Sequence, residues 1–314
     1  MRTVVTGCAG FIGSHLAEAV LRGGHQVVGI DSVTDYYDVA IKRESLKLLE
    51  EQPGFTFVEA DLCSADLVEL LEDVSVVYHQ AGQPGVRLSW SEQFPDYVGR
   101  NIIATQRLLE AAKATRPDRI VFASSSSVYG NAERYPTTEA ALPRPHSPYG
   151  VTKLAAEHLC GLYAANWGLP TIALRYFTVY GPRQRPDMGL NKFIDAARRG
   201  AALPIFGDGE QIRDFTFVSD VVAANIAAGA ADTAPGTVVN IAGGEPVTVN
   251  QLLGILEAAV GAPLRIERLP EQAGDTRQTG GAVDRAHQLL GWYPQVDVAA
   301  GVAAQYAWQA PRVS

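Results

Sequence analysis

Cysteine, histidine and long apolar runs are scarce in this sequence, and each shortage excludes a class of protein. The 314 residues include three cysteines (Cys8, Cys63 and Cys160), which are widely separated and form no CxxC pair. This usage argues against a disulfide scaffold and favours a reducing compartment. The six histidines are scattered without the spacing of metal ligands, so we predict no metal site.

Positive charge is also in short supply, because the formal net charge is −8. This balance gives no electrostatic reason to expect a nucleic acid or an anionic membrane as partner. No stretch approaches the ~20 apolar residues that cross a bilayer, and the apolar run of "MRTVVTGCAG" is too short for a signal peptide. Hydrophobic residues make up 47% of the chain, as in a globular protein with a large core. We expect a cytoplasmic protein with no membrane partner.

Short β-branched segments alternate with amphipathic segments up to residue 177. The predicted strands are "RTVVT", "QVVGI", "FTFVE", "VSVVYH", "RIVFAS" and "TIALRYF". Between them, segments such as "FIGSHLAEAVLRGG" and "NIIATQRLLEAAKA" place apolar residues at helical spacing. This alternation predicts an α/β fold, with a Rossmann-type doubly wound parallel sheet over residues 1–177.

Proline and glycine become frequent beyond residue 177, as in "VYGPRQRPDMG" and "LPIFGDGEQIRDF". We predict that residues 178–314 mainly form a smaller C-terminal α/β lobe. The segment "VVNIAGG" is suited to return to the main sheet as a late strand near residues 237–243. The two parts of the fold therefore need not be contiguous in sequence.

A glycine-rich turn, "TGCAGFIGSH", follows the first predicted strand. Gly7 permits the tight turn, Gly10 lets the backbone approach a pyrophosphate, and Gly13 allows close packing of helix on strand. The helix that starts near Phe11 and Ile12 offers its positive end to the phosphates. The pattern predicts a dinucleotide site.

Further cofactor contacts are predicted at the ends of the following strands. Asp31 ends the second strand, where it accepts hydrogen bonds from the adenosine ribose and repels a 2′-phosphate, which favours NAD over NADP. Asp61 and Leu62 follow the third strand and are placed to meet the adenine. The remaining predicted contacts, at the ends of the fourth and sixth strands, are Gln80, Ala81, Gly82 and Tyr176.

Tyr149 and Lys153 in "SPYGVTK" are one helical turn apart and therefore point the same way. A nicotinamide cofactor removes a hydride, and the alcohol it oxidises must also lose a proton. A tyrosinate can accept that proton, but free tyrosine has a pKa near ~10. We expect the ammonium of Lys153 and the positive nicotinamide ring to favour the anion. Serines in "ASSSSVYG", at the end of the fifth strand, are placed to complete the relay.

The motifs "TGCAGFIG", "SSSSVYG" and "SPYGVTK", in this order, resemble the extended short-chain dehydrogenase/reductase family, which includes sugar-nucleotide epimerases, dehydratases and decarboxylases. The resemblance implies that Tyr149 is the base and that Lys153 orients it and holds the nicotinamide ribose. It assigns the catalytic serine to Ser125, with Ser126 as the other candidate. It also implies a homodimer through two long helices, whose apolar stripes equally fit burial against the sheet.

The resemblance further implies a UDP-sugar substrate bound by the C-terminal lobe. Arg213 matches the arginine that grips the diphosphate, and Arg277 is a second candidate; such pairing is chemically sensible. The loop "PIFGDG" resembles the one that holds uridine, and Phe206 and Gln211 are its candidate contacts. Arg87 in "GQPGVRLSW" is expected to lie over the substrate.

The reaction type is predicted from residues that are missing. Family dehydratases follow the catalytic position with an Asp–Glu pair, and decarboxylases carry a glutamate there, whereas this chain has Ser126 and Ser127. Elimination is therefore disfavoured, and 4-epimerisation is expected. Ser126, Ser127, Thr178 and Arg185 suit a carboxylate, which favours UDP-glucuronate, interconverted with UDP-galacturonate. The alternatives are a UDP-glucose/UDP-galactose 4-epimerase, a UDP-glucuronate decarboxylase and a non-catalytic NAD-binding protein.

Overall fold

A parallel sheet of seven strands forms the centre of the molecule in the computed structural model, which describes residues 1–270 and 276–310. Its strand order is β11-β6-β5-β4-β1-β2-β3. The order reverses between β1 and β4, so β1 lies at a topological switch point. The strands are β1 (Arg2–Thr6), β2 (Gln26–Asp31), β3 (Phe55–Glu59), β4 (Val76–His79), β5 (Arg119–Ser125), β6 (Thr171–Tyr176) and β11 (Thr237–Ile241).

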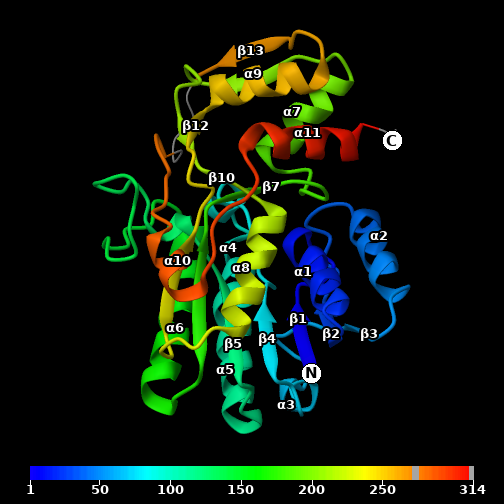
Figure 1. The fold of residues 1–314 in the computed structure, drawn as a ribbon, viewed down its shortest axis with the longest axis vertical. Coiled ribbons are helices and arrows are strands. Elements are labelled where there is room, and N and C mark those ends of the chain that lie inside the picture. The colour runs from blue at the N-terminus through cyan, green and yellow to red at the C-terminus, as the bar shows by residue number, and fades with distance from the viewer. Residues whose placement is uncertain (271–275, 311–314) are drawn as a thin grey trace.

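Helices cover both faces of this sheet (Figure 1), as a parallel sheet requires. Neighbouring strand residues point to opposite faces, so Val5 packs in one hydrophobic cluster and Val4 in the other. The first face is covered by α1 (Phe11–Arg22), α2 (Val39–Glu50) and α8 (Val218–Ala230). The second is covered by α3 (Leu67–Leu70), α5 (Ala104–Thr115) and α6 (Pro148–Trp167). The predicted doubly wound α/β sheet is confirmed.

Local sequence signals explain where α6 begins and ends. The Ser147 side chain accepts a hydrogen bond from the Gly150 amide, and Pro148 occupies the first turn. Serine at the N-cap followed by proline is a strong helix start, because the serine side chain accepts from one orphan amide and proline has no amide N–H to satisfy. Gly168 ends the helix in the left-handed conformation, with φ of 66°. The helix that carries Tyr149 and Lys153 therefore starts immediately before Tyr149.

The segment before α5 differs from the expected continuous α-helix. After η1 (Leu88–Trp90) and α4 (Phe94–Tyr97), residues Val98–Ile103 form a π-helical segment, η2, that leads into α5. A π turn carries one extra residue and often marks a functional position. It holds Asn101 buried, 2% exposed, beneath the site described below.

The remaining elements form a lobe at one end of the molecule (Figure 1). Its core contains Ile194, Leu203, Leu253 and Val302. Its elements are α7 (Gly189–Arg198), β8 (Leu203–Phe206), β9 (Ile212–Arg213), β12 (Val247–Thr248), α9 (Val249–Val260), β13 (Ile266–Leu269) and α11 (Val298–Gln309).

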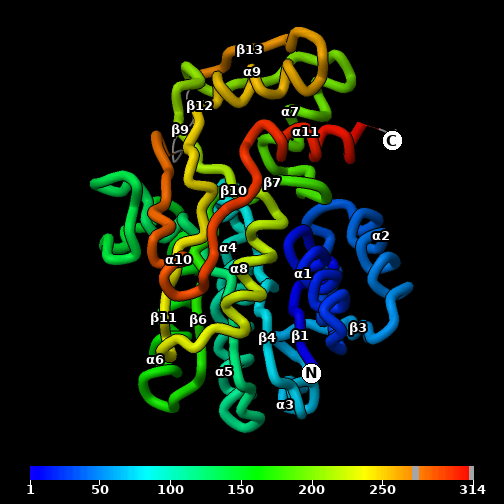
Figure 2. The backbone as a smooth tube through the Cα atoms, viewed as in Figure 1, coloured from blue at the N-terminus to red at the C-terminus, as the bar shows by residue number. Residues whose placement is uncertain are grey.

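The chain passes between the sheet and the lobe more than once (Figure 2). β7 (Thr178–Tyr180) pairs in parallel with β10 (Phe215–Phe217), and α8 and β11 then return to the sheet. α10 (Asp284–Leu290) also lies beside the sheet, before α11 enters the lobe. Residues beyond 177 therefore contribute to both parts of the fold.

The described residues also bear on membrane insertion and metal binding. No helix within residues 1–270 and 276–310 is both long and apolar enough to span a membrane. In the same ranges, histidine, cysteine, aspartate and glutamate form no group of three that would hold a metal ion.

Candidate active site

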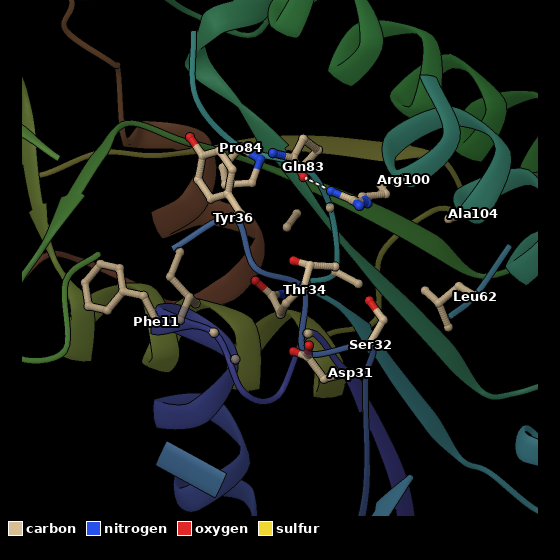
Figure 3. A pocket seen from close by; sticks show the side chains of 18 of the residues that line it. Phe11, Asp31, Ser32, Thr34, Tyr36, Leu62, Gln83, Pro84, Arg100 and Ala104 are labelled. Atoms are coloured by element: carbon tan, nitrogen blue, oxygen red, sulfur yellow. Dashed lines mark hydrogen bonds between the residues drawn. The ribbon is translucent and has the colours of Figure 1, made fainter. Parts of the chain in front are cut away.

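One pocket lies at the carboxyl edge of the sheet, where open α/β folds bind their ligands. Side chains from several loops converge on it (Figure 3). Every residue that the sequence predicted to bind the cofactor lines this pocket: Gly7, Gly10, Phe11, Ile12, Gly13, Asp31, Asp61, Leu62, Gln80, Ala81, Gly82, Tyr149, Lys153 and Tyr176. Residues from separate strand ends therefore meet in one cleft, as expected for the predicted doubly wound parallel sheet.

The glycine turn leaves no room for side chains. Gly7 has a φ of +71°, and a Cβ there would lie 2.8 Å from the Ala81 amide nitrogen. A Cβ on Gly13 would lie 2.0 Å from the Gly7 carbonyl oxygen. These contacts bring α1 close to β1 and point the N-terminus of α1 into the pocket, where it favours a phosphate. The cradle fits the pyrophosphate of a dinucleotide.

Asp31 is fixed by its own loop. Its Oδ2 accepts a hydrogen bond of 3.0 Å from the Ala9 amide, and its Oδ1 accepts one of 2.8 Å from the Val33 amide. Burial raises the pKa of the carboxyl, whereas these bonds and Lys42 oppose the rise. A carboxylate has about four acceptor positions, so this arrangement leaves capacity for the ribose hydroxyls.

Two cations in the same pocket were missed by the sequence reasoning. Lys42 Nζ donates to the Thr34 carbonyl at 2.6 Å and to the Thr34 hydroxyl at 3.0 Å. Arg100 Nη1 donates to Gln83 Oε1 at 2.6 Å (Figure 3). Both cations complement an anionic cofactor. They lie in α2 and in the π turn, where no short motif marks them.

The catalytic group predicted from the YxxxK pair is assembled between α6 and β5. Lys153 Nζ donates a 2.9 Å hydrogen bond to the Ala123 carbonyl oxygen. Ser125, the last residue of β5, lies near the Tyr149 hydroxyl and acts on it as a hydrogen-bonding side chain that lowers its pKa. Ser126, the alternative candidate, lies beyond it in the 3₁₀ turn η3 (Ser126–Val128). The geometry favours Ser125 as the partner of Tyr149.

Of the predicted substrate residues, only Arg185 is among the described residues that line this pocket. Its guanidinium forms two parallel hydrogen bonds with Asp187, of 2.9 and 3.0 Å, and lies 6.0 Å from the centroid of the Tyr36 ring. The Tyr36 hydroxyl also donates to Asp187, at 3.3 Å. Arg185 is therefore a partly buried cation whose charge Asp187 already shares.

Two other predicted substrate residues lie in the lobe, and Arg87, immediately before η1, contacts one of them. The Arg87 guanidinium stacks 5.1 Å from the centroid of the Phe206 ring. Gln211 Nε2 donates to the Phe206 carbonyl at 3.0 Å, while its buried Oε1 has no hydrogen-bond partner among the described residues. A flat ring, a cation and a spare acceptor suit a nucleobase.

Arg213 and Arg277 lie on neighbouring chain segments, because the Ile212 amide donates to the Arg277 carbonyl at 3.0 Å. Arg213 Nη1 donates to the Ile212 carbonyl at 2.9 Å. Arg277 makes a bidentate ion pair with Asp208, both bonds measuring 2.9 Å, which lowers the pKa of Asp208 to about 2. The second candidate for the diphosphate thus engages a protein carboxylate.

Ser126, Ser127 and Thr178 occupy adjacent positions at the sheet edge. The two serines directly follow β5, and Thr178 opens β7 just after β6. β5 and β6 are paired neighbours, with Ser125 opposite Tyr176. The three hydroxyl-bearing residues therefore gather beside the Ser125–Tyr149 pair.

These features have close parallels among known proteins. A model of the NAD-dependent epimerase/dehydratase family matches residues 3–242. The chain belongs to this family. Its cofactor is therefore NAD, which the glycine cradle and Asp31 fit.

Individual relatives cover nearly the whole chain. It is 41% identical over 309 residues, 98% of each chain, to the uncharacterized UDP-glucose epimerase YtcB of Bacillus subtilis. It is 38% identical over 330 residues, 98% of this chain and 96% of the relative, to a probable UDP-glucuronate 4-epimerase of Rhizobium meliloti. The crystal structure of UDP-glucuronic acid 4-epimerase from Bacillus cereus, in complex with UDP-glucuronic acid and NAD, matches with a TM-score of 0.95, 42% identity and 98% coverage of both chains.

One expectation for this NAD-dependent enzyme needs correction. We expected Lys153 to lower the pKa of Tyr149, but burial raises that pKa, and the groups that oppose the rise are Ser125 and Arg185. The reason is geometric, because the Lys153 ammonium is directed to the Ala123 carbonyl. Burial lowers the pKa of Lys153 itself to about 8. The buried environment of the protein alone thus disfavours the tyrosinate.

Asn101 is a further site residue that the sequence reasoning missed. Its Nδ2 donates to the Thr152 hydroxyl at 2.9 Å, and its Oδ1 accepts a 2.7 Å hydrogen bond from the Gln83 amide. A Cβ on Gly82 would lie 2.7 Å from Asn101 Oδ1 and 3.2 Å from Lys153 Nζ. Asn101 therefore links α6 to the backbone at Gln83. Because Gly82 has no side chain, it leaves space for those of Asn101 and Lys153.

Proposed function

We propose that the protein is an isomerase that converts UDP-glucuronate to UDP-galacturonate by NAD-dependent 4-epimerisation. The observation that carries this proposal is the pairing of Ser125 with Tyr149 at the NAD cleft, followed by two serines instead of an acid–base pair. This set supports oxidation and reduction at one carbon. It offers no carboxyl group at Ser126 and Ser127 for elimination.

The protein's own residues have distinct roles in this proposal. Bound NAD supplies the chemistry of reversible hydride transfer at carbon 4 of the sugar. Tyr149 takes the proton from the 4-hydroxyl and later returns it, assisted by the Ser125 hydrogen bond. Lys153, fixed on the Ala123 carbonyl, holds the nicotinamide ribose. The 4-keto sugar turns within the pocket before it receives the hydride on its other face.

A uronate is favoured over a neutral hexose by the groups near Tyr149. Arg185 is a partly buried cation of the pocket, and Ser126, Ser127 and Thr178 place hydroxyl groups at the ends of β5 and β6. Such groups bind a carboxylate with charge-assisted hydrogen bonds. The relatives named UDP-glucuronate 4-epimerase support this choice, and the relative named UDP-glucose epimerase marks the alternative.

A uronate substrate also explains a role for the hydroxyl groups of Ser126, Ser127 and Thr178. Oxidation at carbon 4 gives a β-keto acid, which loses carbon dioxide readily. Hydrogen bonds to the carboxylate hold it away from the alignment that favours cleavage of the carbon–carbon bond. We assign these hydrogen bonds to Arg185, Thr178, Ser126 and Ser127.

The rest of the site and the assembly complete the proposal. We assign uridine binding to Phe206 and Gln211, a covering role to Arg87, and diphosphate binding to Arg213 and Arg277. Residues 1–177 with the strand near 237–243 form the NAD-binding domain, and most of 178–314 forms the UDP-sugar-binding lobe. We propose a cytoplasmic homodimer.

Proton NMR of the purified enzyme with UDP-glucuronate, and separately with UDP-glucose, tests this function. We expect UDP-galacturonate from the first substrate and little change in the second. Formation of UDP-pentose would identify a decarboxylase, and exclusive formation of UDP-galactose would identify the alternative epimerase. Bound NAD with no product from either sugar would support a non-catalytic protein.

A further inference from the structure

A third contact, besides those of the two reactive side chains, joins α6 to the end of β5. The Ser124 hydroxyl donates a 2.6 Å hydrogen bond to Glu157 Oε2. Both residues are buried, at 3% and 5% exposure. Glu157 follows Lys153 by one helical turn, as Lys153 follows Tyr149, so all three side chains project from one face of α6.

Three successive turns of α6 therefore contact three consecutive residues of β5, although not in the order of the strand. The three pairs are Tyr149 with Ser125, Lys153 with Ala123, and Glu157 with Ser124. A helix and a strand held at three consecutive strand positions cannot slide past each other without breaking all three contacts. The first two pairs contain the reactive groups. In the third pair, Ser124 lines the pocket, whereas Glu157 is buried and does not.

The third pair is itself anchored to the rest of the sheet. Arg175 on β6 donates through Nε and Nη2 to both oxygens of Glu157, at 3.0 and 2.5 Å. Its Nη1 donates to the Tyr129 hydroxyl at 2.7 Å, and that hydroxyl donates to Asn240 Oδ1 on β11, also at 2.7 Å. One network thus connects α6 with three adjacent strands.

Such a network is costly, so its presence calls for an explanation. A buried ion pair loses the hydration of both charges, and well-packed apolar residues often stabilise a core at least as well. Directed hydrogen bonds, unlike apolar packing, fix one relative placement of the elements that they join. Glu157 and Arg175 therefore contribute geometry that apolar residues would not supply.

We infer that Ser124 and Glu157 are positioning residues, which fix α6 on β5 and so set the contact between the Tyr149 hydroxyl and Ser125. This inference rests on the proposed function, because it presupposes that Tyr149 and Ser125 act on the substrate. Neither Ser124 nor Glu157 needs to touch the reacting atoms.

The consequence concerns kcat more than substrate binding. If α6 is free to shift, Tyr149 loses part of its hydrogen bond to Ser125, which is one of the groups that lower its pKa. The acid limb of the kcat profile then moves to higher pH. The titratable or charged groups that face Tyr149 are Tyr97, Lys153 and Arg185. A change at Ser124 leaves all of them in place.

The test compares Ser124→Ala with Thr171→Val. Each variant removes one buried hydroxyl bond between α6 and the sheet, since the Thr171 hydroxyl donates to the Cys160 carbonyl at 3.1 Å. Cys160 lies about three helical turns beyond Tyr149 along α6, so the control loosens the same helix farther from the reactive groups. Ser124→Ala is preferred to Glu157→Gln, because the latter leaves the Arg175 charge without its partner and endangers folding.

We expect Ser124→Ala to lower kcat about tenfold, since small misplacements of catalytic groups have effects of this size or larger. Its KM and NAD content stay near the wild-type values, and its acid limb moves upward. Thr171→Val changes kcat less than twofold at a similar thermal stability. Equal kcat values and pH profiles in the two variants would overturn the positioning role alone. A wild-type enzyme that turns over no UDP-sugar would overturn the proposed function together with this inference.

Discussion

The cofactor side and the substrate side of the site are built in different ways. On the cofactor side, glycines and strand-end residues form one pocket whose shape is set by backbone packing. For example, Gly13 packs so closely on Gly7 that an added Cβ would lie 2.0 Å from the Gly7 carbonyl oxygen. On the substrate side, long side chains already have protein partners, with Arg185 on Asp187 and Arg277 on Asp208. Backbone geometry is rigid, whereas an ion pair can exchange one carboxylate for an incoming anion. The first region is preformed, and the second requires exchange of partners.

The largest expected effect is at the point where the two sides meet. Tyr149→Phe removes the hydroxyl that accepts the substrate proton and leaves the ring packed against Tyr97. We expect turnover to fall about a thousandfold, within the range typical of general acid–base groups. NAD content of the purified variant serves as the control and should not change. Wild-type turnover in Tyr149→Phe would overturn the proposed mechanism.

Gly13→Ala tests the preformed side. The added methyl cannot fit between α1 and the Gly7 carbonyl, so the helix must move away from the strand. Overpacking of this kind costs on the order of 1–3 kcal/mol, and it also spoils the phosphate cradle. We expect loss of copurified NAD and a lower melting temperature. Gly24→Ala, at a glycine with a φ of +80° and no atom within 4 Å of the added Cβ, separates backbone strain from steric crowding.

Arg185→Ala tests whether the substrate carboxylate binds Arg185, which is already paired with Asp187. We expect epimerisation to slow by about tenfold, the scale of one charge-assisted hydrogen bond, with more UDP-pentose released. Because Arg185 helps to lower the pKa of Tyr149, its loss raises that pKa, and the acid limb of the kcat profile moves to higher pH. An unaltered rate with UDP-glucuronate would contradict the carboxylate assignment.

Arg277→Ala should have the smallest effect. The Arg277–Asp208 pair is exposed, with side-chain exposures of 60% and 51%, and such pairs contribute about 0–1 kcal/mol to stability. We expect an unchanged melting temperature and a KM for UDP-sugar that rises several-fold. Asp208→Asn, which weakens the competing ion pair, should not raise KM. Equal KM values in Arg277→Ala and the wild type would remove Arg277 from the diphosphate site.

The residues that line the cofactor side of the site follow from the sequence pattern alone. Alternating strands and helices impose a parallel sheet, and the ends of its strands must meet at one edge, so Gly7, Asp31, Gln80 and Tyr176 were predictable as neighbours. Spacing along a single helix likewise placed Tyr149 and Lys153 on one face. These predictions depend on periodicity and on the alternation of strands and helices along the chain, which can both be read from the sequence.

The contacts between side chains of separate elements, by contrast, depend on the tertiary fold. The partners of Lys153, of the buried Asn101 and of Arg100 depend on side-chain directions and on segments distant in sequence. No local pattern encodes them, because each contact results from packing between separate elements. The pKa of Tyr149 shows this best, since burial raises it, and the groups that oppose the rise are Ser125 and Arg185 rather than its helical neighbour Lys153.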